Sequence, residues 1–244
     1  KRDDPLGNAL RAEEAEYRHQ TAKLGKAPDK KEWWMTPQTV NAVQLPLQNA
    51  MNFPAAILEA PFFDPKADDA ANYGAIGAVI GHEVSHGFDN LGSEFDAEGR
   101  LRNWWTKDDA AHFKAATDKL AAQYDAYEAL PGLHLSGKQT LGENIADVAG
   151  LQAAYTAYHK SLGGKQAPVI DGLSGDERFF LAFAQAWRAK QRDAALRAQV
   201  IGDGHAPARW RALTVRNIDA WYQTFKVPEG AKLYLKPEER VKIW

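Results

Sequence analysis

The chain has 244 residues, of which 45% are hydrophobic, and a chain of this size and composition can bury a substantial core. Its formal net charge of −2 gives no electrostatic reason to bind nucleic acid or anionic lipid, so neither is expected as a partner. No apolar run approaches the roughly 18 residues of a membrane-spanning helix. The absence of cysteine excludes disulfides and leaves the compartment open.

In the amino-terminal part of the chain, the sequence predicts two helices separated by a short extended region. Leu6–Leu24 fits a charged amphipathic helix, and residues 39–59 hold two extended stretches. Pro46 and Pro54 confine these stretches to sheet edges or bulges, because proline cannot donate to a strand ladder. Residues 69–89 fit a second and more apolar helix.

The remainder of the chain is predicted to be mainly helical. Thr106 and Asp109 resemble a capping box, which opens a helix that is expected to run to Leu130. The eight tryptophans are expected in the core. Further helices are predicted over 143–160, 176–192 and 208–225, with a loop at 163–175. The fold class expected is mainly α with a minor strand content (α+β).

The most informative segment is His82-Glu83-Val84-Ser85-His86, which matches the pattern H-E-x-x-H. On a helix, residues i and i+4 share a face, so the imidazoles of His82 and His86 can bind one metal ion. Glu83 lies about 100° round the helix from His82, where its carboxylate can address a metal-bound water. Such an arrangement is typical of zinc hydrolases. The alternative is an ordinary helix whose two histidines are satisfied by hydrogen bonds.

The residues before this motif favour a metal site. Residues 75–81 are small and apolar throughout, which predicts a helix that is buried on most sides and packs closely through Gly77 and Gly81. Histidine and glutamate are costly to bury without a partner. A bound metal ion would compensate for them.

A catalytic zinc takes three protein ligands, and without cysteine the third must be His, Asp or Glu. The best candidates are Glu143 and Asp147, which lie four residues apart on one face of a predicted helix. One carboxylate can bind metal, and the other can accept the outer N–H of a ligating histidine. Both can instead be acids that the helix dipole favours in a first turn. Asp89 can serve His86 in the same way, or be an ordinary residue at a helix end.

From about residue 33 to the end, the chain resembles the neprilysin family of zinc metallopeptidases, peptidase family M13. The gap of 57 residues between His86 and Glu143 is itself similar to that family. The matching segments are Val40-Asn41-Ala42, Phe53–Leu58, Pro61-Phe62-Phe63, Asn72–Asp89, Asn103–Thr106, Gly142–Leu151, Phe179–Trp187, His205-Ala206-Pro207 with Arg211, and Trp244. The resemblance implies a zincin (thermolysin/neprilysin-like) catalytic domain over residues 1–244, with a small edge-strand sheet and the H-E-x-x-H helix.

The resemblance also implies roles for the residues of the motif helix and its neighbour. His82, His86 and Glu143 are expected to hold one zinc ion, and Glu83 is expected to be the general base. Asp147 matches an aspartate that supports a zinc histidine and is sometimes assigned as proton donor. The supporting role is favoured, because a carboxylate bonded to an imidazole N–H is badly placed to protonate a leaving amine.

Residues expected to contact substrate are carried over in the same way. His205 matches a histidine that stabilises the oxyanion, and Arg211 matches an arginine that hydrogen-bonds a substrate carbonyl. Asn41 and Ala42 match an edge strand that pairs with the peptide backbone. Taken alone, His205 is an ordinary loop histidine and Arg211 a surface charge.

The resemblance further implies a pocket for the side chain that follows the scissile bond. Its positions are all apolar, which implies a preference for a hydrophobic residue there. They are Ile57, Phe62, Ala78, Val79 and Trp187. Singly, each of these residues can equally be ordinary core.

The function expected is that of a zinc-dependent metalloendopeptidase acting on oligopeptides. A non-catalytic peptide-binding member is the alternative, although Glu83 argues against it. A zinc aminopeptidase would typically show a Gly-x-Met-Glu-Asn-type motif, and none is present. Family members are longer, with an amino-terminal lid, so the missing portion of the same protein is expected as a partner. The lack of cysteine suggests a bacterial member, with a periplasmic or secreted location favoured over a cytoplasmic one.

Overall fold

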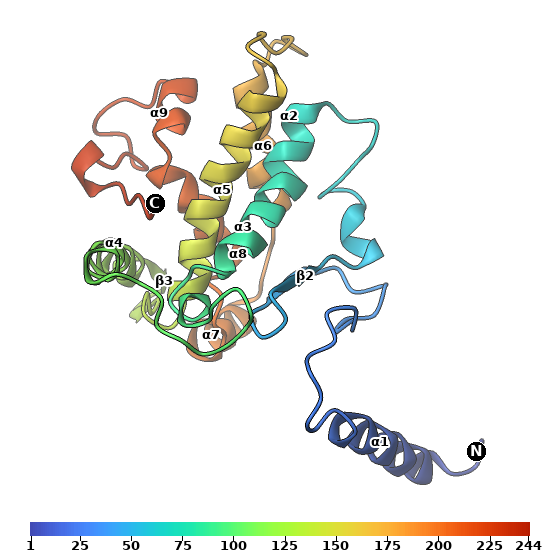
Figure 1. Ribbon diagram of the computed structural model, residues 1–244. Coiled ribbons are helices and arrows are strands. Elements are labelled where there is room, and N and C mark those ends of the chain that lie inside the picture. Colours follow the sequence, from blue (N-terminus) through green and yellow to red (C-terminus); the bar gives the residue numbers. More distant parts are fainter. The chain divides into compact units, whose positions relative to one another are not determined.

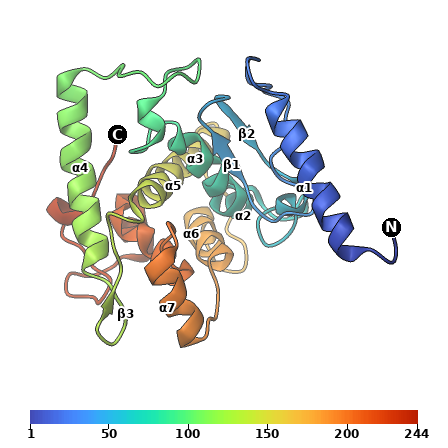
Figure 2. The ribbon, with the colours of Figure 1, turned by 90° about the horizontal axis from the view of Figure 1, so that it is seen from below.

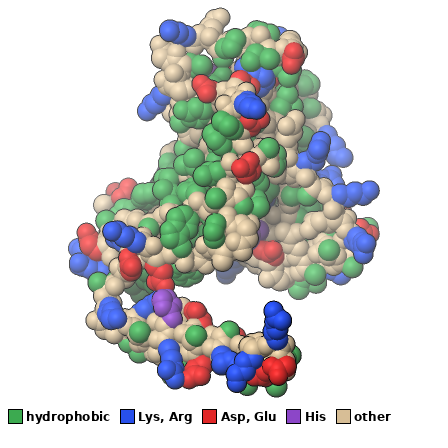
Figure 3. Space-filling view, turned by 90° about the vertical axis from the view of Figure 1, so that its right-hand side faces the viewer, with side chains coloured by type: hydrophobic (Ala, Val, Ile, Leu, Met, Phe, Trp, Pro, Cys, Tyr) green, Lys and Arg blue, Asp and Glu red, His purple; other side chains and the backbone are tan.

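The computed structural model describes all 244 residues, which divide into two compact units, Lys1–Trp33 and Trp34–Trp244. The first unit consists mainly of α1 (Pro5–Thr21), which Asp4 caps by accepting the Gly7 N–H at 2.8 Å. This helix has no buried residue, and charged side chains cover much of its surface (Figure 3). The predicted amino-terminal helix is therefore confirmed. No helix of the structure is long and apolar enough to cross a membrane.

The second unit is mainly helical, as predicted, and carries two small antiparallel sheets, of which only the first was predicted. β1 (Val43–Leu45) pairs with β2 (Ala50–Asn52), and β3 (Glu128–Leu130) pairs with β4 (Leu133–His134). The extended stretch expected from residue 39 begins as a strand only at Val43, so Asn41 and Ala42 directly precede β1. A short 3-10 helix, η1 (Ala55–Leu58), follows β2.

The predicted motif helix is confirmed: it runs without interruption from residue 69 to residue 86, three residues short of its expected end, and comprises three segments. They are α2 (Asp69–Asn72), the π-helical turn η2 (Tyr73–Gly77) and α3 (Ala78–His86). The π turn was not predicted, because the spacing of apolar residues does not separate one wide turn from an α-helical one.

α3 packs against α5 (Leu141–Ser161), and the two helices run side by side in Figure 1. Their closest approach is at two glycines. A Cβ on Gly81 would lie 2.4 Å from the Gly150 carbonyl oxygen, and a Cβ on Gly150 would lie 2.3 Å from the His82 nitrogen. The expected close packing is thus correct for Gly81 and wrong for Gly77, whose Cβ would meet nothing nearer than 3.5 Å. The hairpin of β1 and β2 lies beside α3, and α4 (Lys107–Asp125) lies beyond α5 (Figure 2).

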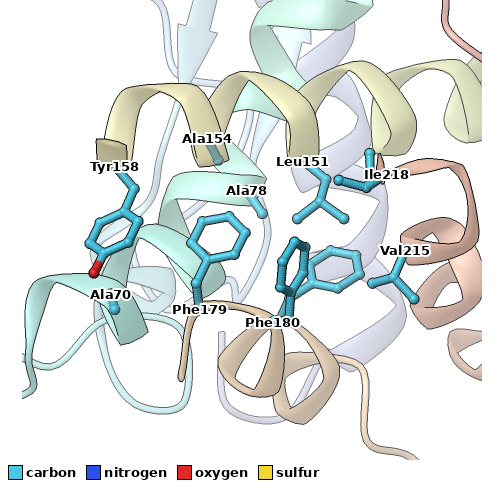
Figure 4. Packing of buried hydrophobic residues seen from close by; sticks show 10 residues of the cluster. Ala70, Ala78, Leu151, Ala154, Tyr158, Phe179, Phe180, Val215 and Ile218 are labelled. Atoms are coloured by element: carbon cyan, nitrogen blue, oxygen red, sulfur yellow. The ribbon is translucent and has the colours of Figure 1, made fainter. Parts of the chain in front are cut away.

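The main core lies between α5 and α6 (Gly175–Ala186). Ser174 and Glu177 form a capping box that fixes the start of α6. Phe179 and Phe180 project from α6 toward α5 in Figure 4, and both are almost fully buried. Each such aromatic side chain contributes about 1.5–3 kcal/mol by leaving water. The cluster holds α5 in place, and with it the acidic residues on its first turns; it comprises Ala70, Ala78, Leu151, Ala154, Tyr158, Phe179, Phe180, Phe183, Val215 and Ile218.

A second core cluster joins α4 (Lys107–Asp125) to the other end of α5 and to the carboxyl terminus. Thr106 caps α4 as predicted, accepting the Asp109 N–H at 3.1 Å. α4 ends at Asp125 and not at Leu130, because the chain turns into β3 there. α6 also ends before its predicted end, at Ala186 and not at residue 192. α7 (Asp193–Gly202) was not predicted. The predicted helical range 208–225 holds α8 (Ala208–Ala212), η4 (Leu213–Asn217) and α9 (Asp219–Phe225).

The expectation that the tryptophans are core residues was wrong for half of them. Trp210 is buried, but Trp33, Trp34, Trp104 and Trp244 are between 44% and 68% exposed. Their indole rings combine a large apolar face with a polar N–H, and this suits them to a surface. The Trp104 N–H, for example, donates to a backbone carbonyl at 3.0 Å while its ring packs on aromatic neighbours.

Gly150→Ala tests the contact between α3 and α5. The added methyl group has no room, so the helices must separate, and unfolding free energy should fall by roughly 1–3 kcal/mol. Metal affinity should fall as well, because the two helices carry the ligand candidates. Gly77→Ala is the matched control on the same helix, and should be neutral or stabilising by up to about 1 kcal/mol. Denaturant unfolding and metal titration of both variants would decide, and equal behaviour would contradict the close-packing argument.

Candidate active site

A cleft of about 750 Å³ runs along α3 and exposes the motif. Apolar side chains from α3, α6 and η1 line it, together with residues from the loops after α3 and before α5. His82, Glu83, His86, Glu143 and Asp147 line it as well. The site therefore has the shape of a binding groove with an ionisable centre.

Three side chains converge in the manner of a metal centre. The Nε2 atoms of His82 and His86 lie 2.9 Å apart. Glu143 places Oε2 at 3.2 Å from the first nitrogen and Oε1 at 3.6 Å from the second. The candidate ligand atoms of the three residues all lie within 4.8 Å of one another. This group could hold a metal ion with two nitrogen donors and a carboxylate.

Each histidine is oriented from behind by a buried aspartate. His82 Nδ1 lies 2.8 Å from Asp147 Oδ1, and His86 Nδ1 lies 2.6 Å from Asp89 Oδ2. The second Asp89 oxygen accepts the backbone N–H groups of Leu91 and Gly92, both at 2.7 Å. Of the two interpretations of Asp89, the geometry favours the partner of His86. Both carboxylates thus hold the ring proton at Nδ1.

The donor set fits a cation. With both protons on Nδ1, the two Nε2 lone pairs face each other and the Glu143 carboxylate. Glu143 Oε2 is buried and accepts no aligned hydrogen bond. The same surroundings favour a positive charge on the ring: burial lowers the pKa of His82, but the adjacent carboxylates of Asp147 and Glu143 outweigh this and raise the pKa to about 9. Two imidazoles and a carboxylate that leave a position open suit zinc in particular.

Arg211 joins this centre from α8. Its Nε and Nη2 atoms donate to the two Asp147 oxygens at 2.8 and 2.7 Å, and the Trp187 ring stacks on its guanidinium at 4.0 Å. Burial alone would raise the pKa of Asp147, but Arg211 and the bond to His82 hold it well below its usual range. Nη1 of Arg211 has no protein acceptor, so this N–H remains available to a bound ligand. The stack on Trp187 was not predicted, since residues far apart in sequence form it.

Glu83 and His205 flank the candidate ligands. Glu83 is only 5% exposed, and this burial raises the pKa of its carboxyl group. His205 lies in the loop between α7 and α8 and brings Nε2 to 3.3 Å from Glu143 Oε1. Asp203 holds the His205 ring through Nδ1 at 2.8 Å. Asp203 was not predicted as a site residue, although its spacing of two residues from His205 was a usable signal.

The predicted pocket residues all reach the cleft. They are Ile57, Phe62, Ala78, Val79 and Trp187, and the cleft is also lined by Ala75 and Phe183, which were not predicted. Asn41 and Ala42 line it as well, directly before the free edge of the two-stranded β1–β2 sheet. The structure therefore gathers every predicted site residue around one cleft, while their roles stay predictions.

The helical fold around an H-E-x-x-H helix is zincin-like, as predicted, and similarity to known proteins defines the family. The profile of peptidase family M13 matches residues 41–241. The chain is 38% identical over 241 residues to endothelin-converting enzyme 1 of Mus musculus, covering 97% of this chain and 31% of that protein. It is 39% identical to an endothelin-converting enzyme homolog of Locusta migratoria, covering 100% of this chain and 34% of the homolog.

Solved structures agree with this similarity. The Mycobacterium tuberculosis zinc metalloprotease ZMP1, in complex with an inhibitor, matches with a TM-score of 0.96 at 49% identity, over all of this chain and 38% of that one. PepO from Lactobacillus rhamnosis matches with a TM-score of 0.81 at 38% identity, over 91% of this chain and 34% of that one. The chain belongs to peptidase family M13. It spans about a third of the length of these relatives.

Asp89→Asn tests whether the orienting carboxylates tune the centre. The amide oxygen of the substituted side chain can still accept the backbone N–H groups of Leu91 and Gly92, but its amide nitrogen cannot accept the His86 N–H. Metal affinity should fall about 10–100-fold, with little change in the unfolding free energy of the metal-free chain. Asp89→Ala, which removes both sets of bonds, should lose stability as well. Unchanged metal affinity in the asparagine variant, measured by competition with a chelator, would contradict this role.

Proposed function

We propose that this chain is the catalytic portion of a zinc-dependent metalloendopeptidase that hydrolyses oligopeptides. The observation that carries the proposal is the convergence of His82, His86 and Glu143, with Glu83 beside them, in an open cleft. Membership of family M13 and the similarity to a zinc metalloprotease support it. Zinc bound by these three residues would polarise a substrate carbonyl and make a bound water acidic.

The chain's own residues account for the remaining steps of peptide hydrolysis. Glu83, buried and with a raised pKa, accepts a proton from the attacking water and returns it to the departing nitrogen. When both of its ring nitrogens carry a proton, His205 donates through Nε2 to the substrate oxygen as negative charge develops on it, and Arg211 donates through Nη1. Asp147 keeps both His82 and Arg211 in place and is too fully bonded to act as the proton donor.

Peptide binding is proposed to use two groups of cleft residues differently. The backbone beside Asn41 and Ala42 continues the free edge of β1, where an extended peptide can add as a strand. The apolar side chains that line the cleft, among them Val79, Phe62 and Trp187, receive the hydrophobic side chain that follows the scissile bond. Because main-chain bonds are indifferent to sequence, this pocket would supply most of the selectivity.

We further propose that the working enzyme includes more polypeptide than these residues, since the relatives are about three times as long. A chain that binds peptides without cleaving them is the alternative function. The presence of Glu83 disfavours that alternative. Peptides with both termini blocked separate an endopeptidase from an exopeptidase, because only an endopeptidase cleaves them.

Glu83→Gln tests the catalytic assignment. The amide keeps the size of the side chain but cannot accept a proton, so cleavage of a blocked peptide should fall at least about 10²–10⁴-fold. Zinc content should stay at the wild-type level, because Glu83 is not a proposed ligand. Glu98→Gln, in an exposed loop, is the control and should cleave normally. Substantial activity of the Glu83→Gln variant would contradict the assignment of Glu83 as the general base.

Val79→Phe tests the pocket. The larger side chain would fill space among the apolar residues of the cleft, and cleavage before Phe relative to cleavage before Ala should drop by about 10-fold or more. Val84→Phe is the matched control on the same helix, since Val84 is 46% exposed and does not line the cleft. The comparison is made with a library of blocked peptides, and an unchanged preference in Val79→Phe would contradict the pocket assignment.

A further inference from the structure

The part of the loop that precedes His205 has little packing of its own. Gly202 and Gly204 have no neighbours within 4 Å of where a Cβ would lie, and His205 is half exposed. The loop follows the last turn of α7, whose terminal carbonyl groups have no partners within the helix. Ala206, directly after His205, is buried in the second core cluster, so the segment before His205 is the part that needs an anchor from outside the loop.

Gln139 makes the contacts that anchor this segment. Its side-chain Nε2 donates to the Asp203 carbonyl oxygen at 2.6 Å and to the Ile201 carbonyl oxygen at 3.4 Å. Asp203 in turn accepts the backbone N–H of His205 at 2.9 Å and its ring Nδ1 at 2.8 Å. A continuous chain of hydrogen bonds thus leads from Gln139 to the His205 imidazole.

Gln139 is itself firmly held. Its backbone N–H donates to Ser136 Oγ at 3.2 Å, and the Gly137 N–H donates to Asp125 Oδ1 at 2.7 Å. A Cβ on Gly137 would collide with a backbone carbonyl of α4, so this segment lies directly against that helix. Glu143 follows Gln139 by four residues, at the start of α5. Gln139 therefore fixes the His205 loop relative to the same segment that carries Glu143.

We propose that Gln139 is a positioning residue that holds His205 beside Glu143 in the orientation needed to donate to a substrate oxygen. The proposal deepens the proposed function and rests on it for its catalytic consequence. Its structural content stands without catalysis. Gln139 lines the cleft, but its side-chain hydrogen bonds go to the His205 loop, so its proposed effect is exerted through Asp203 and His205.

Hydrogen–deuterium exchange of the zinc-loaded chain tests the structural content. In Gln139→Ala, exchange in the 200–206 segment should rise about 10-fold, because two carbonyl bonds are lost, while α5 exchanges as before. Gln152→Ala is the matched control: Gln152 is exposed on α5, its side chain makes no hydrogen bond, and the loop should be unaffected. Wild-type exchange of the loop in Gln139→Ala would overturn the proposal, whether or not the chain cleaves peptides.

A double-mutant cycle tests the catalytic consequence with a blocked peptide. Gln139→Ala should lower kcat about 10-fold with KM and zinc content unchanged, as expected when a donor to the transition state is misplaced. In a His205→Ala background the same substitution should have no further effect. Multiplicative losses would show that Gln139 acts elsewhere and would overturn the proposal. If the wild type cleaves nothing, the proposed function fails, and the exchange measurement still decides the role of Gln139.

Discussion

The candidate site depends on the backbone contact between two helices at Gly81 and Gly150. Neither position has space for a Cβ, and the contact places the His82 nitrogen against α5. At this separation, His82 reaches both Asp147 and Glu143, which lie on successive turns of α5. The aromatic core between α5 and α6 includes Ala78 of α3 and so holds α3 and α5 together. The distances among His82, His86 and Glu143 therefore depend on the packing of residues that are not themselves ligand candidates.

The second constraint on the site is the balance of negative and positive charge among its buried side chains. The buried centre brings four carboxylates, from Glu83, Asp89, Glu143 and Asp147, to two histidines and a single arginine. Arg211 neutralises Asp147, and Asp89 is satisfied by N–H donors. Arg211 Nη2 also lies 3.6 Å from Glu143 Oε2, so one cation is shared by two carboxylates. The two facing Nε2 lone pairs and the buried carboxylates beside them are costly to bury unless a further cation joins them. The Trp187 ring, which stacks on the Arg211 guanidinium, shields the ion pair of Arg211 and Asp147 from water.

Much of the centre could be predicted because its residues repeat at helical spacing. His82, His86, Glu143 and Asp147 each share a helix face with a partner four residues away, and this spacing is visible in the sequence. Sequence reasoning alone could not choose between Glu143 and Asp147; the resemblance did. Contacts between distant segments, such as Gln139 with the His205 loop, leave no periodic signal. α7, the π turn at 73–77 and the exposed tryptophans were missed for a related reason, since local pattern does not encode which surfaces meet.

The central claim is that His82, His86 and Glu143 hold zinc, and X-ray absorption at the zinc edge of the purified, metal-loaded chain tests it most directly. The account predicts one zinc per chain, two imidazole nitrogens and only oxygen otherwise, with ligand distances near ~2.0–2.2 Å. Glu143→Ala should lose most of the metal. A chain that binds no zinc, or a spectrum with fewer than two imidazoles, would contradict the account.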